Sequence, residues 1–194
     1  MDIVNILLNN PRIKIPRATF KQCSKLKYLP KIPPITQIEA YVFYGCSSLL
    51  SITIPDSVKS IGRSSFFGCS SLTKLIIPKK VTAIGIHAFS GCQSLVEITI
   101  PPSVASIGSY AFNNCSSLIE VTLPSSMSVI NESVFKQCTS LAKVTFPSSI
   151  KTVKDNAFDR CCSLKEIHFP SNDVDIHKNA FCNCDAKILL GDQK

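Results

Sequence analysis

This chain of 194 residues contains ten cysteines, whose thiols could form disulfides, bind a metal ion or act as nucleophiles. Eight recur at a constant spacing of 23 residues, from Cys23 to Cys184. Such a spacing stacks equivalent residues in consecutive coils about 4.8 Å apart, which leaves their Cβ atoms farther apart than the ~3.8 Å that a disulfide prefers. The pattern therefore predicts a column of buried free thiols, with the two additional cysteines, Cys162 and Cys182, exposed.

Metal binding and catalysis have no comparable pattern. The histidines His87, His168 and His177 occupy three different positions of the repeat, and no Cys-x-x-Cys pair is present. The sequence also lacks a glycine-rich phosphate loop and a Gly-x-Ser-x-Gly motif. We therefore expect a protein that is not an enzyme and that uses no cofactor, metal or small-molecule substrate.

Phenylalanine keeps the same spacing three residues before cysteine, from Phe20 to Phe181. Self-similarity at a period of about 20 to 50 residues is typical of a solenoid, in which each coil buries its apolar side against its neighbours. No length is left for an enzyme-sized second domain. The sequence predicts one domain over residues 1–194, with a strand-containing partial repeat at 1–10, about eight repeats over 11–186 and a degenerate end at 187–194.

One repeat, residues 49–69, reads Leu-x-x-Ile-x-Ile-Pro-x-x-Val-x-x-Ile-Gly-x-x-x-Phe-x-Gly-Cys. Ile52 and Ile54 alternate with polar residues, which predicts a short strand with one buried face. Pro55 recurs in six copies and should end that strand, because proline has no N–H to donate. The Val and Ile beyond the proline predict a second extended stretch or turn across the back of the coil.

Two further features of the repeat predict its bends. Gly62, Gly85 and Gly108 share one position, where we expect a bend with positive φ that glycine tolerates. The small residue that often precedes the phenylalanine, as in Ala88 and Ala111, predicts a short helical turn that approaches the neighbouring coil closely.

This pattern resembles the BspA-like, treponemal-type leucine-rich repeats. Residues 107–118, Ile-Gly-Ser-Tyr-Ala-Phe-Asn-Asn-Cys-Ser-Ser-Leu, are close to the consensus of that family. The resemblance implies a repeat solenoid that forms a right-handed curved superhelix, with a parallel β-sheet on its concave face and short turns or helical turns on its convex side. It also implies protein binding and cell adhesion or host interaction.

The outward positions of the predicted strands differ from copy to copy, which is where packing leaves the sequence free and a protein partner could be recognised. We therefore take them as the candidate binding face of the concave sheet. They are Ser51, Thr53, Lys74, Ile76, Glu97, Thr99, Glu120, Thr122, Lys143, Thr145, Glu166 and His168. The alternative interpretation is a solvated sheet with ordinary polar neighbours.

The net charge of +8 is unevenly distributed, since residues 1–80 contain 12 Lys and Arg against 3 Asp and Glu. A basic patch of this kind could steer an acidic partner to one end of the array, or could simply be solvated. It predicts an alternative function, anionic-ligand binding, although nucleic acid is not the expected partner. The patch consists of Arg12, Lys14, Arg17, Lys21, Lys25, Lys27 and Lys31.

The first ten residues contain neither a signal peptide nor a membrane span. This observation and the free thiols favour a cytoplasmic scaffold or regulatory subunit, whereas the family resemblance allows the cell surface. An array that opens on a strand at Ile3 predicts a weak homodimer or a longer parent chain. The positive charges of Arg12, Lys14 and Arg17 oppose head-to-head association.

Overall fold

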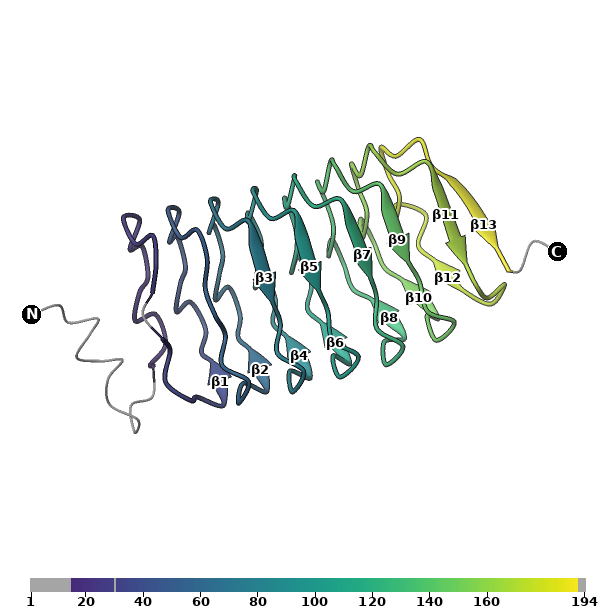
Figure 1. Ribbon diagram of the computed structural model, residues 1–194. Coiled ribbons are helices and arrows are strands. Elements are labelled where there is room, and N and C mark those ends of the chain that lie inside the picture. Colours follow the sequence, from purple (N-terminus) through teal and green to yellow (C-terminus); the bar gives the residue numbers. More distant parts are fainter. Residues whose placement is uncertain (1–14, 30, 192–194) are drawn as a thin grey trace, which may run out of the picture.

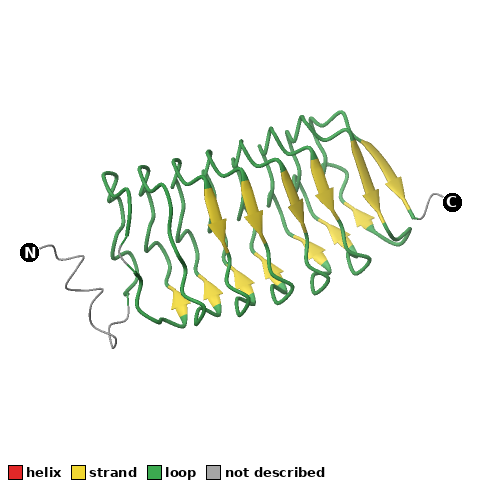
Figure 2. Cartoon of the chain, viewed as in Figure 1, coloured by secondary structure: helices red, strands yellow, loops and turns green. Residues whose placement is uncertain are grey.

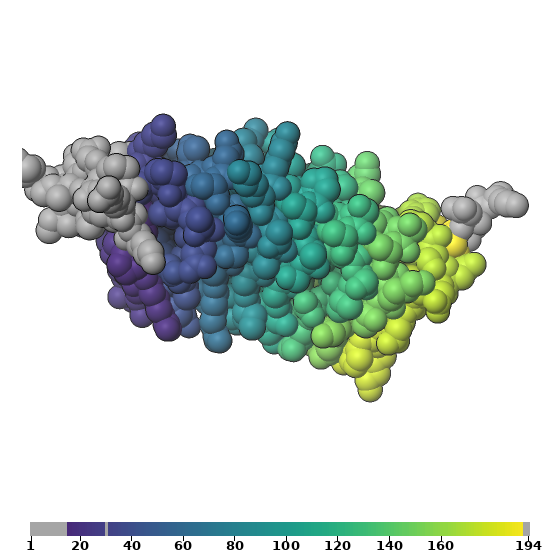
Figure 3. Space-filling view, turned by 90° about the horizontal axis from the view of Figure 1, so that it is seen from below, coloured from purple at the N-terminus to yellow at the C-terminus, as the bar shows by residue number. Residues whose placement is uncertain are grey.

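The structure, a computed structural model, describes residues 15–29 and 31–191. These residues form a single row of stacked coils, which follow one another along the row in the order of the sequence (Figure 1). The space-filling view shows one continuous elongated body (Figure 3). All regular elements in the described ranges are short strands, with turns between them and no helix (Figure 2).

One side of the row carries parallel strands that we call the front sheet. Its strands pair in register as β3 with β5, β7 with β9, and β11 with β13. Their inward residues, such as Leu75 and Val121, are buried, as the predicted alternation requires. The front strands are β3 (Lys74–Ile76), β5 (Glu97–Thr99), β7 (Glu120–Thr122), β9 (Lys143–Thr145), β11 (Glu166–Phe169) and β13 (Lys187–Leu190).

A second set of parallel strands crosses the back of the coils and confirms the predicted second extended stretch. We call these strands the back sheet, which pairs in the orders β1-β2-β4-β6 and β8-β10-β12. They are β1 (Gln37–Ile38), β2 (Ser60–Ile61), β4 (Ala83–Ile84), β6 (Ser106–Ile107), β8 (Val129–Ile130), β10 (Thr152–Val153) and β12 (Asp175–Ile176). The predicted parallel solenoid is thus confirmed, while the curvature that makes its front face concave stays a prediction.

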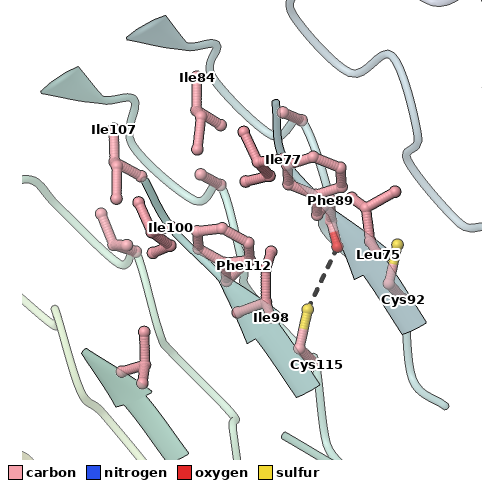
Figure 4. Close-up of a cluster of buried hydrophobic side chains, with 14 of the residues drawn as sticks. Leu75, Ile77, Ile84, Phe89, Cys92, Ile98, Ile100, Ile107, Phe112 and Cys115 are labelled. Atoms are coloured by element: carbon pink, nitrogen blue, oxygen red, sulfur yellow. Dashed lines mark hydrogen bonds between the residues drawn. The ribbon is translucent and has the colours of Figure 1, made fainter. Parts of the chain in front are cut away.

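The phenylalanine column forms the centre of the core between the two sheets. Its rings stack from coil to coil, as Figure 4 shows for Phe89 and Phe112. The ring centroids are 5.3 Å apart for this pair and 5.5 Å apart for Phe112 and Phe135. The rings from Phe43 to Phe158 are fully buried. This continuous stack of rings connects every coil to the next, as expected for a solenoid in which neighbours supply the core.

Each column cysteine from Cys46 onward donates its thiol hydrogen to the backbone carbonyl of the phenylalanine in the preceding coil. Cys115 Sγ lies 3.3 Å from Phe89 O, as Figure 4 shows, and Cys46 Sγ lies 3.1 Å from Phe20 O. The thiol gives the buried carbonyl a second donor, beside the backbone N–H that Phe89 O accepts from Cys92, while it packs as a small apolar group.

The prediction of positive φ at Gly62, Gly85 and Gly108 is wrong, because the positive-φ glycines lie at other positions, such as Gly68 and Gly91. Gly62, Gly85 and Gly108 are required for a close approach of two backbones instead. A Cβ atom at Gly85 would lie 2.6 Å from Arg63 N and 2.7 Å from Gly62 C. Such distances exclude any side chain unless the coils move apart.

Asn131 shows how the same position accommodates a side chain in a later coil. Its Nδ2 donates to Ile107 O at 2.8 Å. The equivalent carbonyl of Ile84 accepts the backbone N–H of Gly108 at 2.8 Å. The amide side chain thus makes the contact between coils that a glycine makes through its backbone.

The predicted helical turn before the phenylalanine is also wrong, since this segment consists of tight turns with two left-handed residues in most coils. One left-handed position is often Gly, as at Gly45 and Gly91, and the other is occupied by larger residues. That second position holds Ala18, Tyr41, Ser64, His87, Tyr110, Ser133 and Asn156, with φ between 50° and 61°. Two left-handed residues four positions apart, such as Tyr41 and Gly45, prevent a regular helix from forming.

The last coil is two residues shorter than the others. Strand β13 pairs with β11 so that Lys187 lies opposite Glu166, an offset of 21 residues instead of 23. The end that the sequence predicted to be degenerate therefore forms a full strand in register, and only the spacing changes after Cys184.

Candidate protein-binding face

The charged positions of the candidate face pair with one another along the front sheet. Lys74 lies opposite Glu97, and their Nζ and Oε2 atoms are 3.4 Å apart. The next pairing places Glu120 opposite Lys143, and the last places Glu166 opposite a lysine of β13. Each strand pair thus brings opposite charges together, which favours this register by a few tenths of a kcal/mol per pair.

The second outward column of the front sheet is mostly threonine. Thr99 and Thr122 are exposed on β5 and β7, and Thr145 continues the column on β9. His168 stands at the same position on β11, with its Nε2 atom 3.3 Å from Glu166 Oε2. The column offers a flat row of hydroxyl and methyl groups to the solvent.

Exposed aliphatic side chains lie on or directly before the same strands. Ile76 on β3 is 65% exposed, and Ile119, just before β7, is 50% exposed. Val96 precedes β5, and Leu50 lies in the coil before β3, and both are exposed. Large exposed apolar groups gathered near one sheet mark a surface that can bury further area against a partner.

Two hollows flank Ile76. One, of about 310 Å³, lies between residues 51–54 and β3 and is lined by Ile52, Thr53, Lys74 and Ile76 among others. The other, of about 410 Å³, shares Asp56, Ile76 and Pro78 with the first and adds Lys79 and Lys80. The strand predicted at Ile52 and Ile54 does not form, because segment 51–54 is extended but not paired with β3, and the hollow occupies the gap between these neighbouring coils.

The hollows involve residues that the sequence analysis did not select. Asp56, Pro78, Lys79 and Lys80 follow the strands, whereas the prediction considered only outward strand positions. Leu50, Val96 and Ile119 were missed for the same reason. These three residues occupy one position of the repeat, just before the front strand. Successive copies have Leu, Thr, Val, Ile, Ala and Lys at this position, and this variation is the signal in the sequence that could have identified it.

The basic patch is only partly described. Arg12 and Lys14 lie outside the described residues, as does the partial repeat at 1–10. The other five members are exposed, but Arg17 and Lys21 lie beside aromatic rings of the next coil. Lys25 belongs instead to the next turn of the chain, and Lys27 follows that turn at the position equivalent to Leu50. The patch therefore divides between two parts of the surface.

The prediction of buried column thiols is confirmed for the six cysteines from Cys46 to Cys161 and is wrong for Cys23, which is exposed, and Cys184, which is half-buried. Burial raises the pKa of Cys92 and of Cys138 to about 12. Contact with the Cys161 thiol lowers the pKa of Cys184. Cys23 and Cys184 belong to the first and the last coil that the structure describes.

Cys162 and Cys182 are exposed, as predicted, and all ten cysteines are free thiols. The histidines do not gather with them: His177 Nδ1 lies 3.0 Å from Asp155 Oδ1. Within residues 15–29 and 31–191, no three His, Cys, Asp or Glu side chains converge on a point where they could hold a metal ion. The same ranges contain no helix of the length and apolarity that crossing a membrane requires.

Stacked coils of about 23 residues, parallel front and back strands and a buried Phe and Cys column define the class of protein as a leucine-rich-repeat solenoid. A family model of the BspA type leucine-rich repeat region matches residues 2–105 and 59–187 in six copies. The chain belongs to the BspA type leucine-rich repeat family. The resemblance predicted from the sequence is thereby confirmed.

Solved structures of bacterial leucine-rich repeat proteins are similar to this chain. A protein from Bacteroides ovatus is 29% identical with a TM-score of 0.77 over 92% of this chain and 55% of its own. A leucine-rich repeat protein of T. pallidum is 35% identical with a TM-score of 0.66 over 72% of this chain and 65% of its own. A leucine-rich cell surface protein from Faecalibacterium prausnitzii is 32% identical with a TM-score of 0.72 over 84% of this chain and 46% of its own.

The chain thus spans between about half and two thirds of the length of these three proteins. No curated protein matches the chain.

Proposed function

We propose that this chain is a non-enzymatic binding module that recognises a protein partner on the outer face of its front sheet. The observation that carries the proposal is the set of exposed aliphatic groups around β3, β5 and β7, with Ile76 between two hollows. Binding energy in protein interfaces concentrates where an apolar group enters a pocket and excludes water. The family and the similar structures, which are all leucine-rich repeat proteins, support the same kind of role.

The threonines and the paired charges suit the rim of such an interface. Lys74 and Glu97 form an ion pair on the exposed face. A partner that covers this pair therefore takes two opposite, neighbouring charges out of water, which costs less free energy than burying two isolated charges. Thr99 and Thr122 supply hydroxyl groups that can donate to and accept from a partner backbone. Specificity would then come from the different residues that each coil presents at one position.

Binding assays on front-face variants test the proposal. The unaltered protein is used to capture partners from lysates of the source cells and of a host, and the affinity for each captured protein is then measured with Ile76→Glu and Ile119→Glu. We expect at least a tenfold loss of affinity, because a charge would be buried in an apolar contact. Ile86→Glu is the control, since Ile86 is an exposed isoleucine just after back strand β4. Equal losses in all three variants would contradict the proposal.

Adhesion at the cell surface is the form of this function that we propose, since the F. prausnitzii protein with 32% identity is a cell surface protein. The second candidate is an intracellular scaffold, which the ten free thiols favour, because reducing compartments keep thiols free. Labelling of intact cells with a reagent that cannot cross membranes distinguishes the two. Labelled protein supports adhesion, and protein that is labelled only after lysis supports the scaffold.

A further inference from the structure

A row of partly buried aromatic rings runs across four coils, in the turns that follow the back strands β1, β2, β4 and β6. We call the residues Tyr41, Tyr44, Phe67, His87 and Tyr110 the aromatic ridge. The rings of Tyr44 and Phe67 stack with centroids 4.8 Å apart, and those of His87 and Tyr110 with centroids 4.7 Å apart. Contacts at 5.9 Å between the two tyrosines and at 6.2 Å between Phe67 and His87 make the row continuous.

Three of these rings occupy strained backbone positions. Tyr41, His87 and Tyr110 have φ angles of 61°, 56° and 61°. The left-handed conformation destabilises a residue that has a Cβ by about 1 kcal/mol. Glycine adopts it without this cost, so an aromatic residue at this position does not make the turn more stable. Ser64, at the same position of an intervening coil, shows that the turn forms without a ring. The aromatic residues are therefore not needed for the turn itself.

Positive side chains are held against one end of the aromatic ridge. The guanidinium carbon of Arg17 lies 4.9 Å from the centroid of the Tyr41 ring, and Lys21 Nζ lies 5.4 Å from that of Tyr44. Arg63 is exposed in the next coil. The pKa of His87 is lowered mainly by the partial burial of its ring and further by the positive charge of Arg63. The ion pairs found among the described residues include none of these three cations.

We propose that the aromatic ridge, together with Arg17, Lys21 and Arg63, binds an acidic peptide segment of a partner protein. Arg and Tyr are the residue types enriched where protein interfaces gain most of their binding energy. Stacking on the neighbouring coil occupies the ring faces and leaves ring edges, which carry partial positive charge, and polar tips for a ligand. Guanidinium, ammonium and phenol groups all donate hydrogen bonds, so their common acceptor is a carboxylate.

The ridge already binds one carboxylate of its own chain. The hydroxyl of Tyr110 donates to Oε1 of Glu132 at 2.7 Å. Glu132 thus lies at the opposite end of the ridge from Arg17 and Lys21, and these two cations form no ion pair with any residue that the structure describes. A nucleic acid fits this surface less well, because bases stack on free ring faces and these rings are stacked on one another.

This surface is separate from the front sheet, since the ridge residues follow the back strands in sequence and the front-face residues lie on or beside β3, β5 and β7. One chain could therefore bind two partners at the same time. The inference does not depend on the function proposed above, and a variant of one surface leaves the other intact.

Fluorescence anisotropy with a labelled peptide of alternating glutamate and glycine tests the proposal. The test variant Arg17→Gln/Lys21→Gln/Arg63→Gln should bind at least tenfold more weakly than the unaltered protein. The control variant Lys151→Gln/Lys154→Gln/Lys165→Gln removes the same charge from exposed lysines of later coils and should bind within threefold of it. Thermal melting followed by circular dichroism establishes that both variants are folded.

Three results would overturn the proposal. Equal losses in the two variants would mean that only net charge matters, and a labelled oligothymidine that binds more tightly than the peptide would mean a nucleic-acid surface. No binding by the unaltered protein up to about 1 mM peptide would mean that the ridge is not a binding surface. Tyr44→Leu keeps an apolar group but removes the ring beside Lys21, and it should weaken peptide binding severalfold.

Discussion

At the scale of single residues, two columns stabilise the stack by different means. The phenylalanines supply apolar area and ring contacts, and the cysteines satisfy the carbonyls that those phenylalanines leave inside the core. Serine could make the same hydrogen bond but would bury a more polar group, and alanine would leave the carbonyl with only the backbone N–H that it also accepts, as Phe89 O accepts that of Cys92. The thiol is therefore a compromise between packing and hydrogen bonding.

Removing one ring from the Phe column should strongly destabilise the protein. Phe112→Ala should lower the free energy of unfolding by about 3–5 kcal/mol, since the ring is fully buried and contacts rings on both sides. Phe67→Ala is the matched control, because Phe67 is only partly buried and lies outside the column. Urea denaturation measures both, and a loss below about 1 kcal/mol for Phe112→Ala would refute the role of the column.

The column thiols should make stability fall steeply with rising pH. Burial raises the pKa of Cys92 and Cys138 from 9.0 to about 12, so in this range the unfolded chain loses protons that the folded chain retains. The contribution of these neutral thiols to the free energy of unfolding is therefore fully present below pH 9, and it is lost as the pH rises from 9 to 12. Each buried thiol should contribute a slope of about −1.4 kcal/mol per pH unit.

Urea denaturation at several pH values above 9 measures this slope. Cys92→Ala should have a shallower slope than the unaltered protein, although it is less stable at pH 8. Cys162→Ser, which replaces an exposed thiol outside the column, is the control for the loss of one cysteine. Identical slopes in all three proteins would show that the column does not titrate as described.

Thiol labelling tests the burial of the same column at neutral pH. A small alkylating reagent should modify Cys23, Cys162, Cys182 and Cys184 in the folded protein, because these are exposed or half-buried. The six remaining cysteines should react only after unfolding. Mass spectrometry of peptides identifies the labelled positions, and rapid labelling of Cys115 in the folded state would contradict the structure.

At the scale of the coil, backbone proximity decides which glycines are essential. Gly85→Ala should cost about 2–3 kcal/mol of stability, because the new Cβ would lie 2.6 Å from a backbone nitrogen. In Gly91→Ala, the new Cβ would have no neighbour closer than 3.5 Å. The only cost is that of placing alanine at a φ of +76°, about 1 kcal/mol. Thermal or urea unfolding compares the two, and a larger loss for Gly91→Ala would reverse this assignment.

Most of the coil could be predicted from the sequence, because the period, the alternation of apolar and polar residues and the proline each have a local cause, although the strand predicted at Ile52 and Ile54 does not form. The roles of Gly62, Gly85 and Gly108 could not, since a close approach depends on the coil beside them and not on their own neighbours in sequence. The left-handed turns at Tyr41 and its equivalents were missed for a related reason: bulky residues rarely adopt this conformation without support from the stack.

The candidate face was only partly predictable. Outward strand positions follow from the period of two, so Thr99, Ile76 and their equivalents are exposed as expected. The opposite charges of Lys74 and Glu97 become a pair only through the register between coils, which no single repeat encodes. The hollows beside Ile76 depend on an unpaired segment between two coils and have no signature in the sequence.

At the scale of the whole molecule, the stack presents two chemically different surfaces. The front sheet offers aliphatic groups, threonines and paired charges, while the turns after the back strands offer aromatic rings with cations beside them. Each coil contributes residues to both surfaces, because packing in the core restricts the residue type only at the inward positions. The central claim is that the front sheet is where a protein partner binds.

Photo-crosslinking tests this claim most directly. A benzophenone amino acid is placed at Thr99 or Thr122, exposed on the front sheet, and at Ala105 or Ser128, exposed just before back strands β6 and β8. After irradiation in cell lysate, the account predicts one discrete crosslinked product from the two front positions and none from the two back positions. A product from the back positions alone would contradict it.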